Sequence, residues 1–271
     1  MAWRILVLLS LASHPLNICG EDRPPTLRLP PRPADAPAGS KFAKQIEQLP
    51  RTERDAAILR EITRGNVPDF LRSLKPIEVT AAAQGVNHRA TYFVTPDYLA
   101  VGSNDDFFRM PMTPLTAQAI ADACDGLLIT AKISDDIFAQ ADLKLPPRPL
   151  TKDRDLAATF YEHHQIIEGQ RRGAALGLLV AGIKKDVVLT NRLREREHRV
   201  AIYGWHYPDG QPIQPLYVGH VDWYVDYSHG IRLMSRRVIV DDQPMDVADV
   251  LTSKELSPLI SHEGPIGVRY K

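Results

Sequence analysis

The stretch that decides the fold is VAIYGWHYPDGQPIQPLYVGHVDWYVD, residues 200–226. Two segments rich in apolar and aromatic residues, 200–207 and 216–226, flank the turn-forming sequence Pro208-Asp209-Gly210. Residues 178–190, 231–234 and 238–240 have the same β character and are separated by polar or Gly/Pro turns. Short connections of this kind favour antiparallel pairing. The C-terminal half therefore predicts a mainly antiparallel β-sheet.

The N-terminal half adds helices. Residues 41–74 and 152–171 have helical apolar stripes, and shorter helices are expected at 113–123 and 134–141. Residues 77–112 alternate β-forming segments with turns, which indicates a meander. Helices early and strands late predict an α+β domain in which N-terminal helices pack on the C-terminal sheet.

The first twenty residues are typical of a secretory signal peptide. They contain Arg4, an apolar run at 5–12 and a short polar exit that ends at Gly20. The run is shorter than the ~20 residues that a membrane span needs. We expect an exported, periplasmic or secreted protein without a transmembrane span. Lipid anchoring at Cys19 is the alternative.

A proline-rich segment follows at residues 21–40. Its repeated prolines favour extended backbone, so we expect a linker before a single α+β domain at 41–271. Removal of the signal peptide would leave Cys124 as the only cysteine, which excludes an intrachain disulfide.

Composition limits the possible partners. Lys plus Arg number 33 and Asp plus Glu number 33, so the chain lacks the net positive charge with which nucleic-acid binders collect phosphate. The hydrophobic share of 44% is that of a globular protein. We therefore expect no nucleic-acid partner.

The densest group of titratable residues is GHVDWYVDYSHG, residues 219–230. If 216–226 is a strand, its period of two puts His220, Asp222, Tyr224 and Asp226 on one face. Asp222 would then orient His220 as a general base or metal ligand, and Asp226 with His229 would supply a second acid, base or ligand.

A divalent metal such as zinc is one use of this group. His220, Asp222 and His229 are the candidate ligands, although no compact zinc signature is present and the ligands would converge from separate elements. The alternative is a half-solvated β face with hydrogen-bonded histidines.

Four further residues are candidates for substrate binding. Lys185 interrupts an apolar row, and together with Arg232 it would hold an anionic group or a developing oxyanion. Trp205 and His206 precede a turn, where binding residues are common. Lys185 as a strand-end lysine that reaches solvent, and the aromatic residues as β core, are the alternatives.

Two resemblances concern the cell envelope. Ser228-His229-Gly230-Ile231-Arg232 resembles the Ser-His-Gly-Cys-x-Arg segment of L,D-transpeptidases, exported enzymes that cross-link peptidoglycan through a cysteine, but this chain lacks that cysteine. GIKKDVVLTNRL at 182–193 and YVDYSHGIRL at 224–233 resemble a family of exported bacterial proteins with no assigned activity. The second resemblance implies export.

The sequence thus favours an exported hydrolase of a cell-envelope or extracellular polymer, either peptide or glycan. One alternative is a non-catalytic envelope protein that binds glycan or peptide, or that serves a structural role. Another is a cysteine-dependent cell-wall peptidase, because Cys124-Asp125-Gly126-Leu127 resembles the Cys-Ser-Gly-Leu segment of papain-like cell-wall peptidases.

Overall fold

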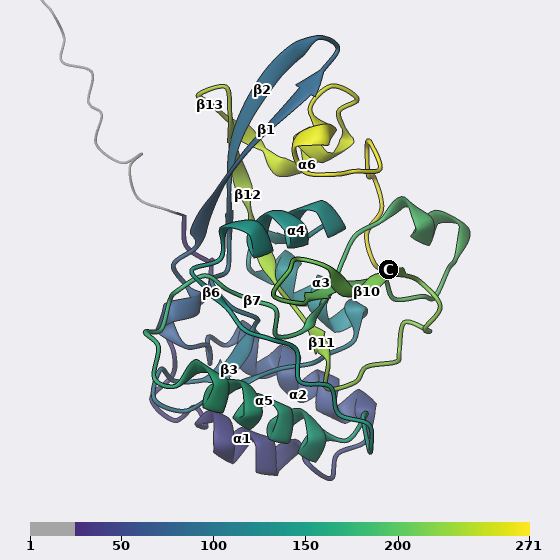
Figure 1. The fold of residues 1–271 in the computed structure, drawn as a ribbon. Coiled ribbons are helices and arrows are strands. Elements are labelled where there is room, and N and C mark those ends of the chain that lie inside the picture. The colour runs from purple at the N-terminus through teal and green to yellow at the C-terminus, as the bar shows by residue number, and fades with distance from the viewer. Residues whose placement is uncertain (1–24) are drawn as a thin grey trace, which may run out of the picture.

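The structure is a computed structural model that describes residues 25–271. The expected signal peptide at 1–20 and Cys19 lie outside the described residues. The expected α+β class is confirmed, since helices and several sheets, mostly antiparallel, alternate along the chain (Figure 1). In the described part of the chain, no helix has the length and apolar character required to cross a membrane.

The α-helices are α1 (Gly39–Ile46), α2 (Arg51–Thr63), α3 (Pro114–Ala123), α4 (Ala131–Gln140), α5 (Ala157–Arg171) and α6 (Val247–Thr252). The strands are β1 (Lys75–Ala83), β2 (Val86–Val94), β3 (Ala100–Gly102), β4 (Phe107–Arg109), β5 (Gly126–Leu128), β6 (Leu143–Lys144), β7 (Val180–Ala181), β8 (Lys185–Val187), β9 (Ile202–His206), β10 (Pro212–Tyr217), β11 (His229–Gly230), β12 (Leu233–Val240) and β13 (Gln243–Asp246).

The largest sheet takes strands from both halves of the chain, in the order β1-β2-β12-β13, with β5 also paired to β12. The β1–β2 hairpin closes through Gln84 and Gly85, which both have positive φ as a tight two-residue hairpin turn requires. This hairpin projects at one end of the molecule beside β13 and α6, while α1, α2 and α5 gather at the other end (Figure 1).

The N-terminal helices pack on neighbours from the first two thirds of the chain. α1 contacts β3, β4 and α5, and α2 contacts α3. Gly39 at the start of α1 lies against the backbone of Phe107, where a Cβ would come within 2.3 Å of the Phe107 carbonyl carbon. This close approach needs glycine and fixes α1 on the β3–β4 hairpin.

From residue 25 the proline-rich segment packs against the rest of the domain, whereas the sequence predicted a linker. Thr26 forms a β-bridge with Ser73, and the Leu27 amide donates to the Arg72 carbonyl. The Arg32 guanidinium donates to the side chain of Asn66, at 2.9 Å. Hydrogen bonds to the body therefore hold this extended chain in place.

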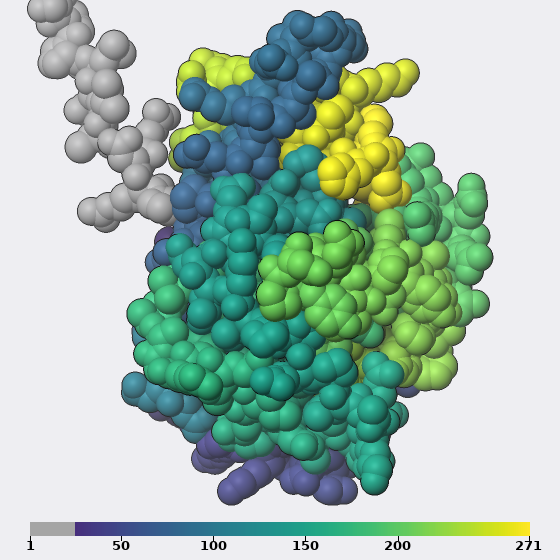
Figure 2. Space-filling model, in the orientation of Figure 1, coloured from purple at the N-terminus to yellow at the C-terminus, as the bar shows by residue number. Residues whose placement is uncertain are grey.

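The second sheet, in the order β10-β9-β8-β11, carries the residues singled out in the sequence. Figure 2 shows the green segment that includes β10 on the outside of the molecule, in front of the teal part of the chain. The prediction of a strand at 216–226 is wrong, because β10 ends at Tyr217 and turns follow. Asp226 accepts hydrogen bonds from Ser228, and such local side-chain bonds compete with a strand ladder.

Candidate functional site

The site is positioned by the pairing of β11 with β8, the one parallel pair in the second sheet within residues 25–271. His229 lies opposite Lys185 in the register, and the Lys185 amide donates to the Ser228 carbonyl at 2.8 Å. The turns at 218–228 lead directly into β11 and bring His220, Tyr224 and Asp226 to the same place. The sheet therefore joins the two segments whose sequences carried the candidate residues.

His229 is fully buried, with 0% of its surface exposed. Neither ring nitrogen has a hydrogen-bond partner among residues 25–271. Buried polar atoms are mostly paired, so two unpaired nitrogens on one buried ring carry a desolvation cost. Burial lowers the pKa of His229 to about 4, and nearby Asp226 offsets only part of that effect. The ring is therefore neutral at pH 7.

His220 is only half-buried. Its ring stacks on Tyr224 with centroids 4.4 Å apart and meets Tyr217 edge-on at 5.1 Å. The Tyr224 ring also contacts His229, at 5.8 Å, so one tyrosine touches both histidines. Burial lowers the pKa of His220, which keeps the ring neutral and able to accept a proton.

Asp226 anchors this cluster as a permanent carboxylate. Oδ1 accepts from the Ser228 amide at 2.9 Å and the Ser228 hydroxyl at 2.5 Å, while Oδ2 accepts from Arg154 at 2.7 Å and the Tyr224 hydroxyl at 3.1 Å. Burial alone would raise its pKa, but His229, the Ser228 hydroxyl and Arg154 together lower it to about 2. Asp226 therefore positions Tyr224 and Arg154, which replaces the predicted acid–base role.

Lys185 supplies a positive charge beside the two histidines. Its ammonium lies 5.9 Å from the centroid of the Trp205 ring and has no ion-pair partner in the part of the chain that the structure describes. Burial lowers its pKa, and Asp226 partly restores it. Lys185 therefore places one cation beside the histidines, and its predicted role in holding an anionic group stays a prediction.

Lys184 is the residue that the sequence argument missed. It is more deeply buried than Lys185, and its ammonium donates to the Tyr227 carbonyl and lies 3.3 Å from His163 Nδ1. Burial and Arg109 lower its pKa to about 7. The apolar row in the sequence contains Lys185 and not Lys184, but β8 is short and follows Gly182, whose positive φ interrupts the alternation.

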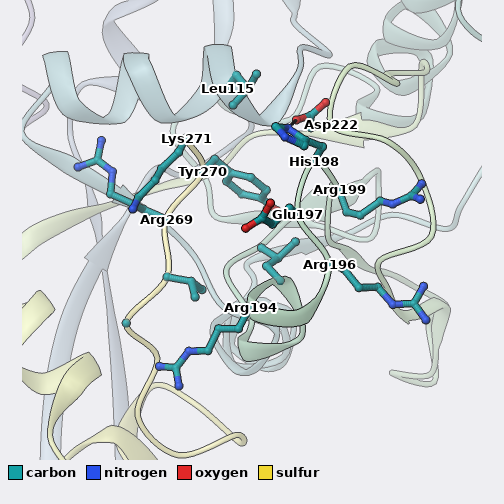
Figure 3. A pocket seen from close by; sticks show the side chains of 13 residues that line it. Leu115, Arg194, Arg196, Glu197, His198, Arg199, Asp222, Arg269, Tyr270 and Lys271 are labelled. Carbon is teal, nitrogen blue, oxygen red and sulfur yellow. Dashed lines mark hydrogen bonds and ion pairs between the residues drawn. The ribbon is translucent and has the colours of Figure 1, made fainter.

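The structure separates Asp222 from the histidines that it was expected to orient. Its carboxylate lies 3.2 Å from His198 Nδ1, on the wall of a cavity of about 310 Å³. Figure 3 shows Asp222 and His198 together at one edge of this cavity, with Tyr270 near its centre. The predicted role of Asp222 beside His220 is wrong, because it required the strand that the turns replace.

Three predicted substrate-binding residues belong to the core. The Arg232 guanidinium is buried and donates to the carbonyls of Thr95 and Val180. Trp205 is 2% exposed, and its ring packs edge-on against His163 and Tyr227. His206 is also buried and bonds Asp135 at 2.8 Å. The predicted substrate contacts of these three residues are therefore corrected to structural contacts.

The two remaining expectations concern metal and thiol chemistry. Within residues 25–271 no group of three or more His, Cys, Asp or Glu side chains is arranged to hold a metal ion. Zinc stays a prediction, and two of the proposed ligands, His220 and His229, contact the same Tyr224 ring. Burial raises the pKa of the Cys124 thiol to about 12, the opposite of what a catalytic thiolate needs.

A second hollow, of about 430 Å³, lies beside His220 and is lined by Arg192, Arg196, Tyr217 and Gly219, among others. The Tyr217 ring crosses Gly219 so closely that a Cβ there would lie 2.1 Å from the hydroxyl. Glycine at 219 therefore lets Tyr217 reach His220. The hollow is lined by Tyr217 and Gly219, and His220 follows them directly in the chain.

Comparison with known proteins yields no match to a family model, a curated protein or a solved structure.

Proposed function

We propose that the protein is an exported hydrolase of a cell-envelope or extracellular polymer, with His220 as its acid–base residue. The observation that carries the proposal is the contact of His220 and His229 with Tyr224, with Lys185 opposite His229 in the sheet and the His229 nitrogens unpaired within residues 25–271. Unpaired, desolvated groups of this kind cost stability and are concentrated at functional sites.

His220 is the group that would move the proton. In amide hydrolysis, neutral His220 accepts a proton from water as the oxygen attacks the carbonyl carbon. It then returns that proton to the nitrogen as the C–N bond breaks. The Lys185 ammonium would stabilise the oxyanion. Asp226 holds Tyr224, on which His220 stacks.

The test is the release of soluble fragments from isolated envelope polymers, with peptidoglycan and extracellular polysaccharide assayed separately. Loss of a general acid–base residue lowers rates by roughly 10²–10⁴-fold, so His220→Ala should reduce release by that factor. His262→Ala is the matched control, because this exposed histidine contacts Asp135, outside the cluster. Equal release by His220→Ala and the unchanged protein would refute the role of His220.

A second candidate function is non-catalytic binding of glycan or peptide. Trp223 favours it, since 52% of this side chain is exposed and the Arg51 guanidinium carbon lies 4.5 Å from its ring centroid. Binding to an envelope polymer without release of fragments from any polymer would support this function over hydrolysis. Fractionation of cells that express the full chain tests the proposed export.

A further inference from the structure

The second hollow, of about 430 Å³, has walls from two segments of the chain. One wall is the end of β10 with the turn after it, and the other is the short 3₁₀ helix Asn191–Glu195 with Arg196. The Arg192 guanidinium donates to the Leu216 carbonyl at 3.0 Å and so joins the two walls. The volume of the hollow lies in the range of about 300–1,000 Å³ that is typical of small-molecule sites.

Tyr217 offers an aromatic ring to this hollow. Its side chain is 44% exposed at the end of β10, where the pairing with β9 shifts register between Gln214 and Tyr217. Such irregularities change the direction of a side chain and are common beside functional sites. Contact with Gly219 and edge-on packing on His220 hold the ring in place. A fixed, exposed ring is a surface on which the apolar face of a sugar packs with little loss of side-chain entropy.

The opposite wall supplies both a hydrogen-bond acceptor and donors. Glu195 and Arg196 are exposed, and their side chains form no ion pair with any residue in the range 25–271. Figure 3 shows the Arg196 side chain directed away from Tyr270 and out of the 310 Å³ cavity. Because charges of both signs line the hollow, it does not select an ion of one sign. Each sugar hydroxyl both donates and accepts, so a carboxylate beside a guanidinium suits it.

We propose that this hollow binds an uncharged glycan, with one sugar ring on Tyr217 and the hydroxyls of that sugar on Glu195 and Arg196. Because the Tyr217 ring contacts His220, the sugar would be held beside the proposed acid–base residue. The inference deepens the proposed function by assigning a glycan to the polymer, and it rests on that function only in taking the bound sugar as part of the polymer that is cleaved.

The test is calorimetric titration of the full chain with chitohexaose and cellohexaose, two uncharged glycans with and without acetamido groups. An oligogalacturonate and an uncharged Gly-Ser peptide are titrated in parallel. We expect one or both uncharged glycans to bind more tightly than either of these, with an affinity that does not depend on salt. Tyr217→Ala should weaken glycan binding roughly tenfold, and Glu195→Ala/Arg196→Ala should weaken it to a similar extent.

Matched controls separate the hollow from general surface effects. Tyr217→Phe keeps the aromatic ring, and Tyr207→Ala removes an exposed tyrosine at the other end of the β9–β10 hairpin. Both variants should bind like the unchanged protein. Binding of neither uncharged glycan, equal or tighter binding of the peptide or the oligogalacturonate, or unchanged affinity in Tyr217→Ala would each overturn the proposal. Absence of fragment release would refute the hydrolase and leave the sugar site intact, because the heat of binding is measured without turnover.

Discussion

Replacing His229 by phenylalanine should make the folded protein less sensitive to acid. The ring is fully buried and its nitrogens lack partners among residues 25–271, so the folded state disfavours the protonated form. Its pKa falls from 6.5 to about 4 on folding. Because the unfolded chain binds the proton first as the pH falls, stability is lost from about pH 6.5 down to about pH 4.

The size of the effect follows from this interval. At pH 5 the unfolded histidine is protonated and the folded one is neutral, and 1.5 pH units separate pH 5 from the unfolded pKa of 6.5. At 1.36 kcal/mol per unit, His229 lowers the free energy of unfolding by about 2 kcal/mol between pH 7 and pH 5. Phenylalanine has a similar shape and does not titrate, so the His229→Phe variant should lack this loss.

Urea unfolding followed by tryptophan fluorescence at pH 7 and pH 5 measures the difference. His229→Phe should lose about 2 kcal/mol less than the unchanged protein between these pH values. The buried His163, whose pKa is lowered to about 2 by burial and Lys184, affects both proteins equally. His262→Phe is the exposed control. An identical loss in His229→Phe and the unchanged protein would refute the burial of an unpaired neutral ring.

Three other substitutions test the surroundings of this ring. Asp226→Asn removes the buried charge that binds Arg154 and Ser228, and should lower the free energy of unfolding in urea by about 3 kcal/mol; an unchanged value would contradict the anchoring role. Gly219→Ala should displace the Tyr217 ring and lower kcat/KM for fragment release roughly tenfold, while the midpoint of urea unfolding stays constant. An undiminished kcat/KM would exclude Tyr217 from the site. The pKa of Lys184 falls from 10.5 in the unfolded chain to about 7 in the folded protein. Between pH 7 and pH 9 the unfolded chain therefore holds a proton that the folded chain has released, and the free energy of unfolding of the unchanged protein should rise by about 2 kcal/mol. Lys184→Met should lack this gain, and the same gain in both proteins would assign it to another group.

Local sequence signals predicted helices whose N-terminus is capped by a residue next to the helix in the sequence. Thr113 accepts a hydrogen bond from the Thr116 amide and caps α3, as Thr113-Pro114 indicated. α4 begins earlier than the expected residue 134, because Thr130 caps it by accepting from the Ile133 amide. The strand expected at 216–226 failed because its apolar alternation continued through residues that side-chain hydrogen bonds hold in turns.

The sequence indicated which residues cluster at the candidate site, but not which partners each of them contacts. A dense run of His, Asp and Tyr identified His220, Asp226 and His229, and the structure brings these together. Their roles depend on partners far away in the sequence, such as Arg154 on Asp226. The core position of Arg232 likewise depends on the carbonyls of Thr95 and Val180, which no local pattern indicates.

The central claim is that His220 acts as the acid–base group of a hydrolytic site. The pH dependence of kcat/KM for fragment release tests it most directly. Because burial lowers the pKa of His220 below 6.5, the account predicts an acid limb with its midpoint below pH 6.5. The residual activity of His220→Ala should lack that limb. A midpoint above pH 6.5, or the same limb in His220→Ala, would contradict the claim.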